Sequence, residues 1–270
     1  MDVIKQLSLV GLVPVIKVED AGDAVPLCRA LAAGAAYIVS PGINPAIVKY
    51  CQDKGVPIVP GTANPSNVET ALELGLKTVK FFPAEAVGGL KAIKAMSAPY
   101  GGVSFLPTGG INEKNVVDYL AFPKVVAVGG SWMAPNDAVK AKDWDRIETL
   151  ARSAVDLVLG LELKHVGINS GNADQALKDA TLLSRLLDCP VREGNKSTFA
   201  GVAFECMKTV GRGHNGHVAI ATNSIERARW HLERRGFAFD DDSIGVKDGK
   251  ITAIYLKDEI AGFAFHLLQK

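Results

Sequence analysis

The chain has 270 residues, of which 48% are hydrophobic and 22% are charged, and its formal net charge is +1. This composition is typical of a folded globular protein with one large domain or two modest ones. The near-neutral balance gives no argument for nucleic acid or a membrane surface as a partner, and no apolar run reaches the length of a membrane span.

The cysteines and the first residues indicate the compartment. The chain contains four cysteines without any CxxC spacing: Cys28, Cys51, Cys189 and Cys206. We expect free thiols in a reducing cytoplasm rather than disulfides. The N-terminal stretch MDVIKQLSLVGLVPVIKV lacks the basic start and the small-residue cleavage site of a signal peptide, which agrees with a cytoplasmic protein.

Up to about residue 158 the sequence alternates between apolar strands and amphipathic helices. The predicted strands cover residues 12–18, 35–40, 56–61, 78–84, 103–109 and 125–130. Near-continuous apolar strands joined by helices are typical of a parallel sheet that is covered on both faces. We expect a last helix over residues 143–159 and a linker over 160–164. This linker would separate a first domain, 1–160, from a second, 165–270.

The second half of the chain contains a duplicated unit. The strand HVGI (165–168) is followed by the helical stretch ADQALKDATLLSRLLD, and the strand HVAI (217–220) is followed by SIERARWHLERRG. Each unit then closes with a similar strand, over 201–208 and 262–270. Internal similarity of this length predicts two copies of one supersecondary element, each with a strand, a helix and further strands.

A charged residue interrupts the predicted strand TVKFFPAE (78–85). Alternation places Thr78, Lys80 and Phe82 on one face, which in a closed parallel barrel is the lumen. Low dielectric there lowers the pKa of a lysine, and the neutral amine can form a Schiff base with a carbonyl substrate. The alternative is a lysine at a strand end that extends toward solvent, and this strand by itself leaves both interpretations open.

Two glycine-containing turns follow the next two strands. The first is Pro107-Thr108-Gly109-Gly110, and the second is Gly129-Gly130-Ser131. Glycines in such turns let backbone N–H groups approach an anion closely. In a (β/α)₈ barrel the loops after the last two strands often bind phosphate. Each turn alone could be an ordinary turn, but two in succession favour a phosphate site.

Together these segments resemble a known enzyme family. VPVIKVED, SPG, VPGTANPSNVETALELGLKTVKFFPAE, FLPTGGI and VGGSWMAP are similar to the 2-keto-3-deoxy-6-phosphogluconate (KDPG) and 4-hydroxy-2-oxoglutarate (KHG) aldolases over most of residues 10–158. The resemblance implies a cytoplasmic, trimeric class I aldolase that uses no cofactor. It would cleave KDPG to pyruvate and glyceraldehyde 3-phosphate, or KHG to pyruvate and glyoxylate.

The resemblance also implies roles for individual residues. Lys80 would be the Schiff-base lysine, and Thr108 would contact the pyruvate end of the substrate. The phosphate would be held by the glycine turns: Gly109, Gly110, Gly129, Gly130 and Ser131.

The chain departs from this family in its number of strands. We predict a TIM-type barrel truncated to six strands, whereas the family has eight, and the gap falls around Gly34 and Ala35. The family has there an E-x-T-x-R strand, whose glutamate shuttles protons, and a G-A-G-T strand. The arginine and this threonine help to hold the substrate carboxylate. Without them we expect severely reduced activity, in a barrel that stays open or closes through a partner chain.

The duplicated half resembles a second family. A histidine opens the first strand of each unit, and a potential metal ligand lies four residues after Gly201 and after Gly262. This pattern is similar to the vicinal oxygen chelate, or glyoxalase-like, α+β fold of two βαβββ modules. It implies a site for a divalent Fe, Mn, Ni, Co or Zn ion with open positions for substrate. The implied ligands are His165, Glu205, His217 and His266. The alternative is a metal-free binding or packing module.

Three functional hypotheses follow from these resemblances. The first is an aldolase, acting on a keto acid or sugar-acid phosphate, fused to a glyoxalase-like domain. In the second, the aldolase half is a scaffold and the C-terminal domain is a metal-dependent lyase, isomerase or dioxygenase. The third is a non-catalytic protein that binds small molecules.

Overall fold

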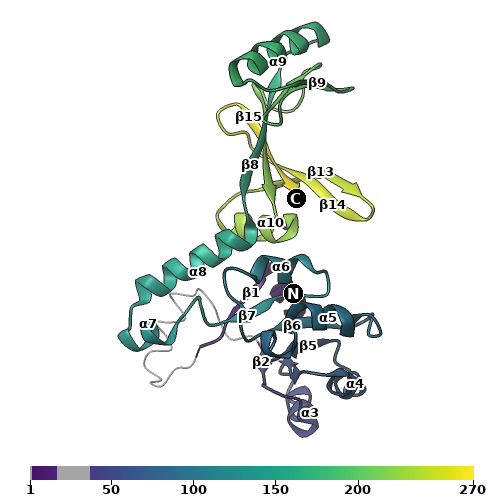
Figure 1. Cartoon of the computed structure of the whole chain (residues 1–270), viewed down its shortest axis with the longest axis vertical. Helices are drawn as coiled ribbons and strands as arrows, with labels where there is room; N and C mark the ends of the chain where they lie inside the picture. The colour runs from purple at the N-terminus through teal and green to yellow at the C-terminus, as the bar shows by residue number, and fades with distance from the viewer. Residues whose placement is uncertain (1, 17–36) are drawn as a thin grey trace. The chain divides into compact units, whose positions relative to one another are not determined.

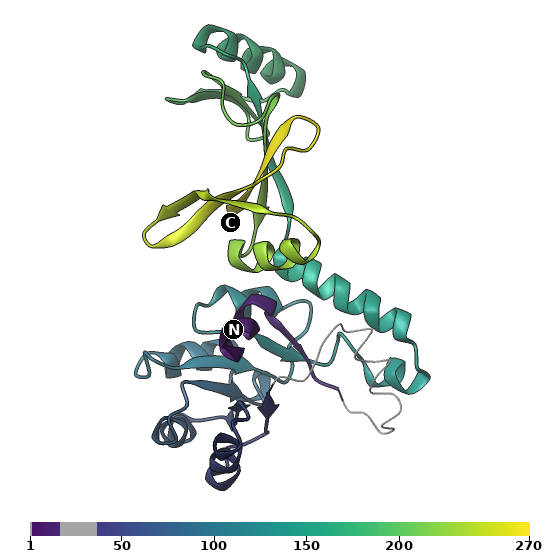
Figure 2. The same ribbon diagram turned by 180° about the vertical axis from the view of Figure 1, so that it is seen from behind.

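The computed structural model describes residues 2–16 and 37–270. Cys28 and the positions around Gly34 and Ala35, where the two missing family strands are expected, lie outside these residues. The chain divides into two compact units, Met1–Val158 and Leu159–Lys270, which are described one at a time (Figures 1 and 2). None of the helices in the described part is both long and apolar enough to cross a membrane.

The first unit alternates short strands with helices. Its strands are β1 (Leu12–Pro14), β2 (Ile38–Val39), β3 (Ile58–Val59), β4 (Gly61–Thr62), β5 (Thr78–Phe81), β6 (Ser104–Pro107) and β7 (Val128–Gly130). Its helices are α1 (Val3–Val10), α3 (Pro45–Asp53), α4 (Pro65–Glu73), the 3₁₀ turn η2 (Glu85–Val87), α5 (Gly89–Ser97), α6 (Val116–Ala121), α7 (Asn136–Ala141) and α8 (Trp144–Leu159). The predicted α/β character is therefore confirmed, although most strands are shorter than expected.

The strands of this unit are parallel and form an arc. Strand β4 pairs with β5, β5 pairs with β6, β2 pairs with β3, and β1 pairs with β7. Single bridges from Phe105 to Val125 and from Thr108 to Gly129 join β6 to the β7 segment. Strand β3 lies within the strand predicted over 56–61, and β4 follows it from Gly61 to Thr62, one residue past the predicted end. Among the residues that the structure describes, β1 and β2 do not pair with each other, so the arc is open between them. With β3 and β4 counted as one interrupted strand, the described arc contains six strands.

Side-chain alternation separates an outer from an inner core in this unit. Val79 and Phe81 of β5 pack outward into a cluster that includes Val68 of α4, Ile93 of α5 and Val116 of α6. The inner cluster contains Leu7 from α1, Val59 and Leu106 from the strands, and Ala127, which lies just before β7. Because the faces of a strand alternate, Thr78 and Lys80 are on the inner side.

Two helices of this unit begin at the same local motif. Asn44 caps α3 by accepting hydrogen bonds from the backbone N–H groups of Ala46 and Ile47, and Asn64 caps α4 by accepting one from Asn67. A proline follows each cap at the first helical position, where its missing N–H has no partner to lose. The sequence Asn-Pro thus determines where both helices start.

The second unit is built on one eight-stranded mixed sheet. Its strands are β8 (Glu162–Asn169), β9 (Val191–Glu193), β10 (Ser197–Ala200), β11 (Phe204–Met207), β12 (Gly216–Thr222), β13 (Phe239–Lys247), β14 (Lys250–Leu256) and β15 (Phe263–Gln269). The helices are α9 (Ala173–Leu187) and α10 (Ile225–Arg234). The linker expected over 160–164 is wrong in its second part, because β8 already begins at Glu162, which pairs with Ala221 of β12.

The strand order shows the internal duplication. It runs β13-β14-β15-β12-β8-β11-β10-β9, so each half contributes four consecutive strands and the two first strands, β8 and β12, meet in the middle. Each first strand is parallel to the last strand of its own half, and β8 and β12 are antiparallel. Helix α9 packs through Ala176 and Ala180 on one face of the sheet, against Ala200 and Cys206. The opposite face is free of this helix.

Candidate functional site

The first candidate site surrounds Lys80 in β5. Its side chain is 6% exposed, and its Nζ atom lies 4.6 Å from the ring centroid of Phe82. Register pairs Lys80 with Gly61 on one side and with Leu106 of the inner cluster on the other. Burial lowers the pKa of the Lys80 ammonium. The arrangement therefore supplies a shielded amine that loses its proton more readily than a surface lysine.

The glycine turns lie beside the carboxyl end of the lysine strand. Thr108, which is 5% exposed, donates its backbone N–H to Phe81, and its carbonyl accepts from Ala84. Gly109 accepts from the N–H of Glu85. The same edge continues to Gly129, which bridges to Thr108. The structure thus brings Lys80, Thr108 and both glycine turns to adjacent strand ends.

Two of these glycines are required by close packing. A Cβ atom on Gly129 would lie 2.4 Å from Thr108 Oγ1, and one on Gly110 would lie 2.5 Å from Glu85 Cγ. Gly110 also has a positive φ of 80°, which disfavours other residues. Ser131 is exposed at the end of the second turn. Glycine at 129 therefore lets Thr108 sit against the neighbouring strand.

Lys80 has no charged partner nearby in the described part of the chain. No described residue forms an ion pair with its Nζ atom. The glutamate, arginine and threonine that the aldolase resemblance would place beside it have no counterpart there. The shielded amine is present, but the acid–base group expected to serve it is not among the described residues.

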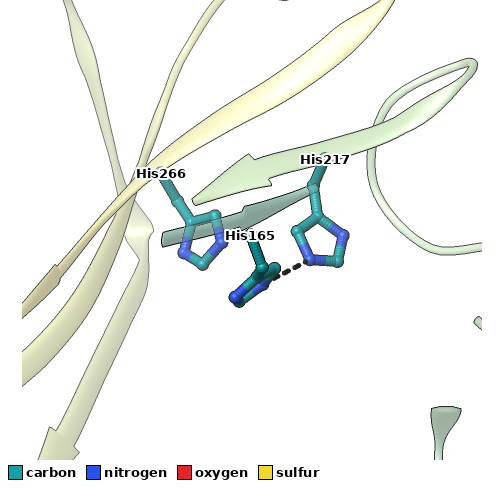
Figure 3. A group of neighbouring side chains, drawn as sticks. All are labelled: His165, His217 and His266. Carbon is teal, nitrogen blue, oxygen red and sulfur yellow. Dashed lines mark hydrogen bonds between the residues drawn. The ribbon is translucent and has the colours of Figure 1, made fainter. Parts of the chain in front are cut away.

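The second candidate site is a cluster in the C-terminal unit formed by His165, Glu205, His217 and His266, hereafter the His/Glu cluster. Figure 3 shows the three imidazoles converging from neighbouring strands. One ring nitrogen from each of the three histidines lies within 4.8 Å of the other two. His165 Nε2 is 3.1 Å from His217 Nε2, and each is 3.2 Å from Glu205 Oε2. The four residues come from β8, β11, β12 and β15.

Strand register explains why these residues meet. His217 pairs across β12 and β8 with Gly167, which pairs in turn with Glu205 of β11. His165 pairs with Ala219, which pairs with His266 of β15. Directly paired residues project to the same face of a sheet, so the ligand-type side chains lie on one surface. This is the face opposite to α9.

Glu205 is held in one orientation. Ser197 Oγ donates a hydrogen bond to Oε1 at 2.6 Å, while Oε2 faces His165 and His217. Burial alone would raise the pKa of the Glu205 carboxyl, but hydrogen bonds from these three residues hold it well below its usual range. The group is therefore a carboxylate with one oxygen available to a metal ion.

His266 is the residue whose environment fits a metal ligand best. Both of its ring nitrogens are buried and have no hydrogen-bond partner among the residues described. Tyr255 stacks on the ring with a centroid distance of 4.5 Å and an interplanar angle of 15°. Burial, followed by the neighbouring histidines, lowers the pKa of His266 to about 3. A neutral imidazole with unpaired buried nitrogens is the form that binds a metal ion.

Gly167 makes room for His217. A Cβ atom at position 167 would lie 2.0 Å from His217 Cε1 and 2.3 Å from its Nδ1. The imidazole therefore lies directly against the backbone of β8. The 3.1 Å between His165 Nε2 and His217 Nε2 suits two ligands bound about 2.1 Å from one ion. Three imidazoles and a carboxylate are a donor set that fits a divalent transition metal.

Comparison with known proteins identifies the first unit. The family model described as KDPG and KHG aldolase matches residues 28–150. The 2-dehydro-3-deoxy-phosphogluconate aldolase of Treponema pallidum is 44% identical over 150 residues, which are 56% of this chain and 69% of that protein. The chain belongs to the KDPG and KHG aldolase family. The family expected from the motifs is therefore confirmed.

Two further relatives support this membership. The 2-dehydro-3-deoxy-phosphogluconate aldolase of Haemophilus influenzae is 50% identical over 129 residues, 48% of this chain, and the chain spans 61% of its length. The KDPG aldolase of Legionella pneumophila, solved with pyruvate captured as a covalent carbinolamine intermediate, is 30% identical with a TM-score of 0.52. That match covers 56% of this chain and 97% of the solved one.

Several residues around the His/Glu cluster were not singled out from the sequence. They are Gly167, Arg192, Ser197, Phe199 and Tyr255. Gly167, Ser197, Phe199 and Tyr255 lie next to a cluster residue through strand pairing or a side-chain contact, and Arg192 lies against Phe199. The duplicated pattern could have indicated Phe199 and Tyr255, because each precedes the last strand of its unit, but the register was needed to place them.

Proposed function

We propose that the first unit is a Schiff-base aldolase domain in which Lys80 condenses with a 2-keto acid. The observation that carries this proposal is a lysine that is only 6% exposed, on the inner side of a parallel strand, in a chain of the KDPG and KHG aldolase family. The substrates proposed are KDPG or KHG, with pyruvate as the shared product.

The chemistry needs the neutral form of the Lys80 amine, which burial favours by lowering the pKa of this group. The Nζ atom of Lys80 attacks the C2 carbonyl, and loss of water from the carbinolamine gives a protonated imine. Cleavage of the C3–C4 bond releases the aldehyde product, as the C4 hydroxyl loses its proton and the electron pair passes into the imine. Protonation at C3 and hydrolysis by one water then release pyruvate and restore the amine.

The neighbouring groups would position the substrate. Thr108 is near the lysine at the adjacent strand end, where its hydroxyl can bind the pyruvate carboxylate. The turns at Gly109 and at Gly130 would expose backbone N–H groups to a phosphate. Because the described residues offer no general acid or base beside Lys80, we propose slow turnover. We also propose that copies of the chain associate, as a trimer, which light scattering would test.

Borohydride trapping tests the Schiff base directly. The full chain is incubated with pyruvate, reduced with borohydride, digested and mapped by mass spectrometry. We expect the adduct at Lys80, and its loss in Lys80→Met. The matched control is Lys77→Met, which changes an exposed lysine just before the same strand. An adduct spread over surface lysines, or none, would contradict the proposal, and pyruvate release from KDPG measures the turnover.

We propose a second function for the C-terminal unit, a divalent metal centre in a glyoxalase-like fold. The specific observation in its favour is His266, with both ring nitrogens buried and unpaired, beside two histidines and an oriented carboxylate. His165, His217 and His266 would hold the ion through nitrogen, and Glu205 through Oε2. A bound divalent ion would act as a Lewis acid toward substrate oxygens.

Metal binding tests this second proposal without assuming a reaction. The metal-stripped full chain is titrated with Co²⁺ by calorimetry and visible absorption. We expect one equivalent to bind and to raise the thermal midpoint of the C-terminal unit. His266→Ala should abolish the high-affinity binding, whereas His214→Ala, a change at a loop histidine outside the cluster, should not. Equal Co²⁺ affinity in His266→Ala and His214→Ala would contradict the proposal.

A further inference from the structure

Aromatic rings border the His/Glu cluster on two sides. Phe199 pairs in register with Glu205, and Tyr255 pairs in register with His266. The two aromatic residues therefore occupy equivalent positions in the two halves, on the face that carries the cluster. Phe199 meets His165 edge-on at 6.3 Å between centroids, and Tyr255 stacks on His266. A ligand bound at the cluster would lie between these rings.

Each ring has an arginine against it, but the two arginines differ. Arg192 Cζ is 4.6 Å from the ring centroid of Phe199, and Arg212 Cζ is 4.9 Å from that of Tyr255. The Arg212 guanidinium forms an ion pair with Asp240 at 2.8 Å, so its charge is compensated. Arg192 forms no ion pair with any residue of the described chain. One uncompensated positive charge therefore lies on the Phe199 side.

The position of the Arg192 charge sets the length of a ligand that could reach it from the His/Glu cluster. Arg192, Phe199 and Glu205 are paired in register across β9, β10 and β11. Neighbouring strands are about 4.8 Å apart. Because the guanidinium lies over the ring on β10, its charge is roughly one to two strand spacings from Glu205. This span matches the separation between the two ends of a small dicarboxylic acid.

The charge balance of the face favours a dianion. A divalent ion with one carboxylate ligand and three neutral imidazoles leaves one positive charge at the cluster. Arg192 adds a second. A guanidinium that is stacked on a ring is held in orientation and presents paired N–H donors to a carboxylate.

We propose that Arg192 is a specificity-determining residue that binds the far carboxylate of a small 2-hydroxy or 2-oxo dicarboxylic acid. The near end of this ligand, a carboxylate with its adjacent oxygen, would bind at the His/Glu cluster. The inference rests on the metal-centre function proposed above. It specifies the class of ligand: a dicarboxylate with a chain of about five carbons, and not a monocarboxylate.

Two probe acids test whether the far carboxylate of a ligand contributes to binding. The Co²⁺-loaded full chain is titrated with 2-hydroxyglutarate and with 2-hydroxyvalerate, and binding is followed by calorimetry and by the visible absorption of Co²⁺. The two acids share the chain length and the hydroxy-acid end and differ in the far carboxylate. Neither has a keto group, so neither can condense with Lys80.

We expect 2-hydroxyglutarate to bind at least about tenfold more tightly, the effect of one charge-assisted contact. Arg192→Gln should bring its affinity to that of 2-hydroxyvalerate, without changing Co²⁺ affinity or the binding of 2-hydroxyvalerate. Arg185→Gln is the control, because this exposed arginine is on α9, which packs on the other face. Arg212→Gln should have a smaller effect than Arg192→Gln, since Asp240 already compensates that charge.

The possible failures are distinguishable. Equal affinities for the two acids in the wild-type chain would overturn the inference and leave the metal centre standing. The same holds if the affinity ratio is unchanged in Arg192→Gln, or if neither acid binds while Co²⁺ does. Failure of Co²⁺ to bind would overturn the metal centre, and this inference with it.

Discussion

Replacing Gly167 by alanine tests whether the His/Glu cluster depends on a bare backbone beneath His217. The added Cβ atom would lie 2.0 Å from His217 Cε1. Unstrained carbon–carbon contacts begin at about 3.5 Å, so the ring must move by roughly 1.5 Å. Metal–ligand distances vary by only about 0.2 Å, so this shift removes His217 from the donor set.

Two quantities should change in Gly167→Ala. Co²⁺ affinity should fall at least about 100-fold, because losing a ligand costs more than losing a group that merely orients one, which costs about 10–100-fold. The free energy of unfolding of the metal-free chain should fall by about 1–3 kcal/mol, the usual cost of overpacking. Calorimetric titration measures the first, and chemical denaturation of the metal-free chain measures the second.

Matched variants separate this cause from a general effect of the substitution. Gly211→Ala is the control, because its Cβ atom would meet nothing closer than 3.5 Å, an ordinary contact. The double variant Gly167→Ala/His217→Ala should be more stable than the sum of the two single changes predicts, since the alanine then occupies the space of the ring. Wild-type Co²⁺ affinity in Gly167→Ala, or strictly additive losses in the double variant, would refute the reasoning.

Three further predictions concern both units. Ser197→Ala removes the 2.6 Å hydrogen bond to Glu205 and should weaken Co²⁺ binding about tenfold in calorimetry, with unchanged affinity as the contrary result. Gly129→Ala places a Cβ atom 2.4 Å from the Thr108 hydroxyl and should lower stability by about 1–3 kcal/mol and pyruvate trapping severalfold; wild-type trapping would contradict this. Because burial lowers the pKa of Lys80, the trapping rate should reach half its maximum below the ordinary lysine pKa of 10.5. Between the lowered pKa of folded Lys80 and 10.5, the unfolded chain holds the proton and the folded chain does not. The free energy of unfolding of the wild type relative to Lys80→Met should therefore rise with pH in this range, as measured by urea denaturation. A difference that does not change with pH would exclude a shifted pKa for Lys80.

The sequence alone determined the features that depend on a few consecutive residues. Alternation in TVKFFPAE indicated the face of Lys80, which the structure places on the inner side of β5. Asn-Pro fixed the starts of α3 and α4 through capping and a preset φ. The aldolase family followed from the KFFPAE and glycine-turn motifs, and the duplication from repeated text. Strand limits were less well predicted, because a strand ends where its partner ends and not where its own apolar run does.

Only the tertiary structure decided which residues of the C-terminal unit meet. The duplication indicated four ligand-type residues, but nothing local placed Gly167 under His217, Ser197 on Glu205, or Phe199 with Arg192 beside them. These contacts depend on register between strands that are far apart in the chain, and a shift of one residue would turn each side chain to the other face. Pairing between β8, β11 and β12 sets that register, and the pairing exists only once both halves of the sheet have formed.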